Sequence, residues 1–187
     1  MSNNFQIVDL PGRGNIRIAT TGALSTNELS GVKSPEWMLK IDDITYSTVE
    51  GYSDYVELFG WQGESSRLTG PDISGPLYTS STLRHTDLIL MIPVGGHAAQ
   101  IESKMNRGEN IDSLKIVRLG NIFQTKVRLQ ELEFNACKIQ TYQQQLDRLI
   151  VHVMIGIKTN TVFVYDQSGL CTGQMVSKTN YITNVAE

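Results

Sequence analysis

Apolar and polar residues alternate along most of this chain with the period of two that is typical of β-strands. Residues 37–41 and 55–61 show this alternation, and the stretch 149–157 is apolar at most positions, which predicts a strand buried on both faces. Residues 161–165 continue the pattern, and a turn follows at 166–173. The chain is therefore expected to be mainly β, with its last fourteen residues loosely held.

The stretch 87–119 carries the one convincing helix pattern, between two predicted strands. Four apolar side chains recur at helical spacing and share one stripe: Val94, Ala98, Ile101 and Met105. Gly108 follows basic residues, as is common where a helix ends in a left-handed residue. These signals predict a helix over about 97–107, with Val94, Ile101 and Met105 buried against the sheet.

A hairpin is predicted after the helix, because Gly120-Asn121 separates two strand patterns, 114–119 and 122–134. Within the second pattern, the apolar residues change parity partway along. This change indicates either a β-bulge near Gln130-Glu131 or a strand that changes sheets there.

A long segment, residues 62–86, is rich in Gly, Pro, Ser and Thr and is predicted to be a loop. Loops of this length are uncommon unless they are functional. This one either contacts a neighbouring subunit or a stacked ring, or is a disordered surface loop of ordinary linker composition. Its apolar residues are the candidate interface: Leu68, Ile73, Leu77 and Tyr78. The expected domain organisation is an N-terminal arm, 1–34, with one short strand near Ile16 and Ile18, followed by a β-barrel domain with a C-terminal tail, 35–187.

Composition narrows the possible functions. The 187 residues are 40% hydrophobic, enough for one core, and the net charge of −3 gives no field that attracts nucleic acid. The longest apolar run is seven residues, far short of the roughly 20 needed to cross a bilayer, so no membrane insertion is expected. The first thirty residues lack a secretory signal pattern. Cys137 and Cys171 are expected to be reduced thiols.

Candidate chemistry in the sequence is sparse, so no catalytic, cofactor or metal site is predicted. His85, His97 and His152 do not have the spacing of a metal site. His85 and Asp87 could serve a nearby hydroxyl in a hydrolase, but the surrounding residues of such a site are missing. Glu131 and Glu133 share one strand face. Paired catalytic acids can be arranged in this way, but the solvated face of an ordinary strand has the same pattern.

Several segments, in order and spacing, resemble Hcp, the hemolysin-coregulated tube protein of type VI secretion. The resemblance covers roughly residues 36–173 and rests on five segments and one turn: WMLKIDDI (residues 37–44), DYVEL (54–58), Asp87-Leu88, the helix ending in Arg107-Gly108, VRLQEL (127–132) and the turn Asp166-Gln167-Ser168-Gly169.

This resemblance implies a small β-barrel of two packed sheets with one α-helix. It also implies homohexameric rings that stack into the inner tube of a contractile apparatus, with the spike protein, the sheath and effectors as partners. The chain is then a structural protein and not an enzyme, made in the bacterial cytoplasm and secreted without a signal peptide. The alternatives are a phage-type tail tube protein and a small-molecule-binding β-barrel.

Overall fold

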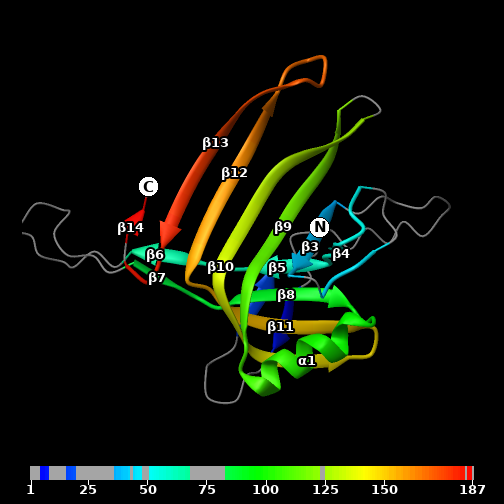
Figure 1. Cartoon of the computed structure of the whole chain (residues 1–187), viewed down its shortest axis with the longest axis vertical. Helices are drawn as coiled ribbons and strands as arrows, with labels where there is room; N and C mark the ends of the chain where they lie inside the picture. The colour runs from blue at the N-terminus through cyan, green and yellow to red at the C-terminus, as the bar shows by residue number, and fades with distance from the viewer. Residues whose placement is uncertain are drawn as a thin grey trace, which may run out of the picture.

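The computed structural model describes residues 5–8, 16–19, 36–42, 44–47, 51–67, 83–122, 125–183 and 185–186. These residues form a mainly β structure with one α-helix (Figure 1). The elements are β1 (Phe5–Val8), β2 (Ile16–Ala19), β3 (Trp37–Ile41), β4 (Val56–Glu57), β5 (Gly60–Gln62), β6 (Ser65–Arg67), β7 (Leu83–His85), β8 (Leu88–Pro93), α1 (His97–Arg107), β9 (Asn110–Ile122), β10 (Thr125–Gln145), β11 (Arg148–Met154), β12 (Ile157–Tyr165), β13 (Cys171–Asn180) and β14 (Val185–Ala186).

Ten strands belong to one antiparallel sheet, which bends around a single main core. Its order runs β14-β13-β12-β10-β11-β8-β5, and β9 joins β10 to β3, which in turn pairs with β4. The mainly β fold with one helix confirms the prediction, but the expected barrel is not closed by hydrogen bonds. Among the described residues, β4 pairs with β3 and β5 pairs with β8, and no strand pairing links β4 to β5. Segment 56–62 connects these two regions through the chain itself.

The 21-residue strand β10 makes the bend possible because it serves two halves of the sheet. On one side, β10 pairs with β9 as far as Lys138; on the other side, residues 130–135 pair with β12 and residues 138–145 pair with β11. Ala136, at the change of partner, has a positive φ of 54°. A register shift between Arg128 and Gln130 marks the bulge that the parity change predicted, and the change of partner lies further along the strand.

The helix α1 spans the predicted residues and ends at Gly108, whose φ of 65° is left-handed. Ile101 is fully buried in the core, as expected, and Met105 is only partly buried against it. Val94 was wrongly assigned to the buried stripe, because it lies before the helix and is 37% exposed. The buried His97 replaces it in the first turn, where its Nε2 lies 2.8 Å from the carbonyl oxygen of Pro93.

Two strand predictions need correction. The strand expected over 55–61 is interrupted between β4 and β5. Strict alternation would place Trp61 on the face opposite to Val56 and Leu58, but it packs against the same core, beside Trp37. The predicted hairpin is present, but Gly120-Asn121 is not its turn, since Gly120 pairs with Val127 and Asn121 with Lys126 inside the ladder. A Cβ at Gly120 would lie 2.5 Å from the side chain of Leu129, so this glycine allows a close approach inside the ladder and does not form the turn.

The C-terminal residues were also wrongly expected to be loosely held. β13 pairs with β12 at nine positions from Ile157–Asn180 to Tyr165–Cys171. The sequence pattern missed this strand because backbone hydrogen bonds hold it in place, while its residues 171–178 are all exposed and need no apolar alternation.

Candidate assembly interface

The hairpin β12–β13 extends beyond the core, and we call residues 157–180 the wing (Figure 1). β12 is bonded on one side to β10 and on the other to β13. The outer edge of β13 pairs with β14 only at Thr179 and Asn180. Within the described part of the chain, the edge from residue 171 to 178 therefore has no strand beside it. Such an edge is a ready template for pairing with another chain.

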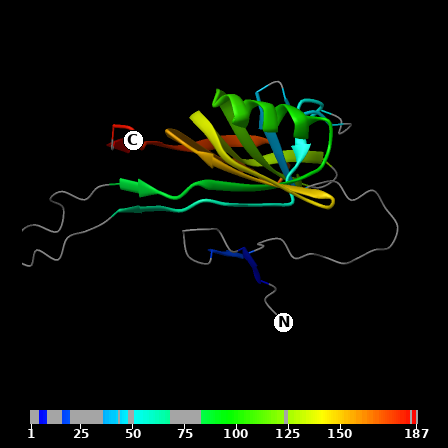
Figure 2. The same ribbon diagram turned by 90° about the horizontal axis from the view of Figure 1, so that it is seen from below.

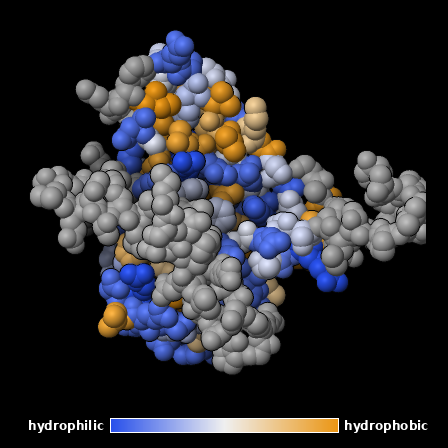
Figure 3. All heavy atoms as spheres, turned by 180° about the vertical axis from the view of Figure 1, so that it is seen from behind, coloured by the Kyte–Doolittle hydropathy of each residue, from blue (hydrophilic) through white to orange (hydrophobic). Residues whose placement is uncertain are grey.

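Apolar side chains are exposed on the same wing. Cross-strand pairing places Val162 opposite Met175, so these two side chains share a face, and Val164 lies two residues further along it. Met175 is 69% exposed, and both valines are 39% exposed. Figure 3 shows apolar side chains gathered over the upper part of the long strands. Exposed apolar residues beside an open edge are typical of an interface.

The tip of the wing is held by one carboxylate. Asp166 Oδ1 accepts hydrogen bonds from the backbone N–H of Ser168 at 2.8 Å and of Leu170 at 3.0 Å. The hydroxyl of Ser168 also donates to it, at 2.6 Å, and this bond is the main reason why the pKa of Asp166 is lowered. Tyr165 donates its hydroxyl proton to the carbonyl of Arg128, which ties the wing to β10. These bonds define the turn at the tip of the wing and join β12 to β10.

The carboxylates considered as paired catalytic acids take part in structural ion pairs. Lys115 lies opposite Glu133 in the ladder, and its Nζ is 3.3 Å from Glu133 and 3.6 Å from Glu131. Arg128 also pairs with Glu131. Each acid therefore has a cationic neighbour on the same sheet face, which is what a cross-strand ion network provides.

The histidines are distributed over separate elements: His85 in β7, His97 at the start of α1 and His152 in β11. Burial lowers the pKa of His152, which favours a neutral ring. Among the described residues, no group of three His, Cys, Asp or Glu side chains is arranged to hold a metal ion. Both cysteines are free thiols, with Cys137 buried and Cys171 exposed.

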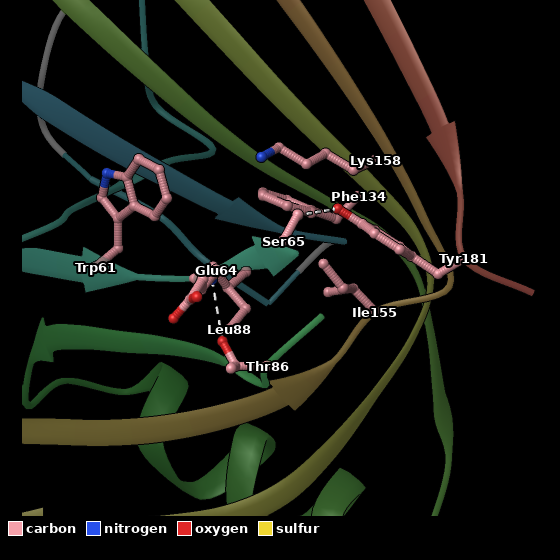
Figure 4. A pocket seen from close by; sticks show the side chains of 10 residues that line it. Trp61, Glu64, Ser65, Thr86, Leu88, Phe134, Ile155, Lys158 and Tyr181 are labelled. Carbon is pink, nitrogen blue, oxygen red and sulfur yellow. Dashed lines mark hydrogen bonds between the residues drawn. The ribbon is translucent and has the colours of Figure 1, made fainter. Parts of the chain in front are cut away.

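A small pocket marks the base of the ribbon formed by β6 and β7 (Figure 4). Ser65 in β6 forms a hydrogen bond with the hydroxyl of Tyr181, and the ring of His85 in β7 lies 4.4 Å from the ring of Tyr181. Lys158 points into the same pocket, and burial lowers its pKa. These contacts fasten both strands of the ribbon to Tyr181, the residue that follows β13.

The pocket is too small for an organic ligand. Its volume of about 10 Å³ is close to the space of one water molecule, whereas small-molecule sites typically enclose about 300 to 1,000 Å³. The main core beside it is filled by large side chains such as Phe134. Nothing in this pocket therefore favours the small-molecule-binding alternative.

The predicted interface residues Leu68, Ile73, Leu77 and Tyr78 lie outside the described residues. The described ends of that segment, β6 and β7, form a ribbon that projects sideways from the barrel in both Figure 1 and Figure 2. Sequence reasoning missed Val162 and Met175 as surface residues, because an apolar residue in a strand is ordinarily assigned to the core.

In the described part of the chain, no helix is long and apolar enough to cross a membrane.

Comparison with known proteins gives a clear result at the level of structure only. No family model matches the sequence. No curated protein matches it either.

Several solved structures match with high probability. One described as a type six secretion system protein has a TM-score of 0.72 at 14% identity, covering 82% of this chain and 100% of that one. Hcp1 from Salmonella typhimurium has a TM-score of 0.63 at 15% identity, covering 81% and 97%. The secreted protein Hcp3 from Pseudomonas aeruginosa has a TM-score of 0.55 at 15% identity, covering 74% and 97%. At these identities, the likeness shows that the chain shares the fold of these proteins.

Proposed function

We propose that this chain is a structural subunit that forms hexameric rings and stacks them into the inner tube of a type VI secretion apparatus. The observation that carries the proposal is the fold, since nearly the whole length of Hcp1 and of the other type VI secretion protein aligns with this chain. The spike protein, the contractile sheath and effectors are then its partners, and export follows a route without a signal peptide.

The wing supplies one side of the subunit contact. A cyclic ring needs a heterologous interface, in which one surface of each subunit meets a different surface of the next. The open edge of β13 offers backbone donors and acceptors, and Val162, Val164 and Met175 offer apolar area beside it. A neighbouring strand added at this edge would satisfy the backbone groups and cover these side chains together.

The segment between β6 and β7 supplies a second contact, to a neighbouring subunit or to the next ring. The described strands at its two ends contact Tyr181, the residue that follows β13, through Ser65 of β6 and His85 of β7. Leu68, Ile73, Leu77 and Tyr78 are the residues we assign to this contact. Replacing residues 69–80 by a short Gly/Ser link should leave the melting temperature near that of the wild type, because loop-closure entropy varies slowly with length. Assembly should be lost.

The test of the main proposal is the size of the purified protein. Sedimentation velocity should show a hexameric species, and negative-stain microscopy should show rings that stack end to end. A protein that stays monomeric at tens of micromolar would contradict the proposal. Tubes that hold DNA when isolated from cells would favour the phage-type alternative instead.

A further inference from the structure

The sheet formed by β5, β8 and β11 has a second apolar face that is separate from the core. Leu90 and Val151 point into the core, so the alternate residues of the same strands point the other way. Strand pairing aligns Met91 with Ile150 on that outer side, and Ile89 with His152. We call Gln62, Ile89, Met91, Ile150 and His152 the outer face.

This face is covered. Ile150 is 0% exposed and Met91 is 6% exposed, yet neither belongs to either of the two clusters that form the core. Gln62 lies at the edge of the face, and its Oε1 is buried without a hydrogen-bond partner. An apolar surface with an unused acceptor, shielded from water but outside the core, indicates that another segment lies on it.

The N-terminal hairpin β1–β2 is placed to be that segment. Figure 1 shows it behind β8 and β11, and Figure 2 shows it on the opposite side of this sheet from α1. Its eight residues, FQIV and IRIA, include two polar ones, Gln6 and Arg17. A two-stranded hairpin alone is marginally stable in water, so this one needs an apolar surface to pack on.

We propose that the outer face is the docking surface for the N-terminal hairpin of the same chain. The hairpin acts as a removable cover, which keeps Ile89, Met91 and Ile150 from contacting other proteins until it is displaced. The solved type six secretion system protein aligns over its whole length with 82% of this chain, so about a fifth of this chain has no counterpart in it. A device specific to this chain is consistent with that comparison. The proposal stands independently of ring formation, because it concerns a different surface from the wing.

Methionine footprinting of the full-length protein tests the cover directly. Three methionines report separately: Met91 on the outer face, Met38 fully buried in the second apolar cluster with Val117, and Met154 exposed at the end of β11. Peroxide converts accessible methionine to its sulfoxide, which mass spectrometry locates. In the wild type, Met91 should be protected like Met38, and Met154 should react.

An Ile16→Asp, Ile18→Asp double variant should release the cover by placing charge in the hairpin. Met91 should then oxidise at a rate approaching that of Met154, while Met38 stays protected. The matched control is Arg17→Asp, which alters a polar position of the same strand and should leave Met91 protected. If Met91 remains as protected as Met38 in the double variant, or if Met38 becomes reactive with it, the hairpin is not a removable cover and the proposal is wrong.

Dilution distinguishes an intramolecular cover from one supplied by a second copy. Protection of Met91 should be the same across a wide range of protein concentrations, because the hairpin and the face belong to one chain. Loss of this protection on dilution would show that another copy covers the face, which would overturn the proposal.

Discussion

Met175→Asp should abolish ring formation and leave the folded subunit intact. Met175 is 69% exposed in the subunit, and surface substitutions of this kind usually change stability by less than about 0.5 kcal/mol. Full burial of a methionine side chain contributes roughly 1.5 to 3 kcal/mol, so burial of the exposed two-thirds at an interface contributes about 1 to 2 kcal/mol. The variant loses this contribution at each contact and also has to bury a carboxylate, which costs considerably more.

Leu146→Asp is the matched control, because Leu146 is 98% exposed at the β10–β11 turn, away from the wing. Its φ of 47° is left-handed, a conformation that Asp adopts readily. Sedimentation velocity should give monomers for Met175→Asp and rings for Leu146→Asp, with both melting temperatures close to that of the wild type. Rings of Met175→Asp at wild-type stability would refute the assignment of the wing to the interface.

Three further predictions concern the subunit itself. Gly156→Ala should destabilise it by about 1 to 3 kcal/mol in urea unfolding, because a Cβ there lies 2.9 Å from the Cβ of Ala136 and 3.2 Å from its carbonyl oxygen. Gly173→Ala meets no atom within 4 Å and should change stability little; an equal loss in both variants would contradict the packing argument. A thiol reagent at pH 8 should label Cys171 and spare Cys137, whose burial raises its pKa to about 12, until denaturant is added. Burial lowers the pKa of His152 in the folded chain. Below the ordinary histidine pKa of about 6.5, the unfolded chain therefore binds a proton at this residue that the folded chain does not bind. The unfolding free energy should therefore fall as pH drops through this window, and less steeply in His152→Asn, as calorimetry can check.

The local pattern of the sequence determined the helix and most of the strands. The recurrence of Ala98 and Ile101, with Gly108 as the left-handed end, defines α1 because helical side chains three or four residues apart share one face. The aliphatic run in β11 predicted a strand buried on both faces, and residues 149–153 are buried throughout. These features depend on neighbours along the chain, so the sequence alone was sufficient.

The candidate interface and the outer face were decided only by the tertiary structure. Val162 and Met175 are apolar residues that alternation alone assigns to a core, yet the length of β12 and β13 carries them beyond it. Ile89 and Ile150 belong to strands that read as core on both faces, and only the pairing of β8 with β11 shows that one face lies outside the core clusters. A strand's hydrophobic pattern tells how many of its faces avoid water, whereas what covers each face depends on residues that are distant in the sequence.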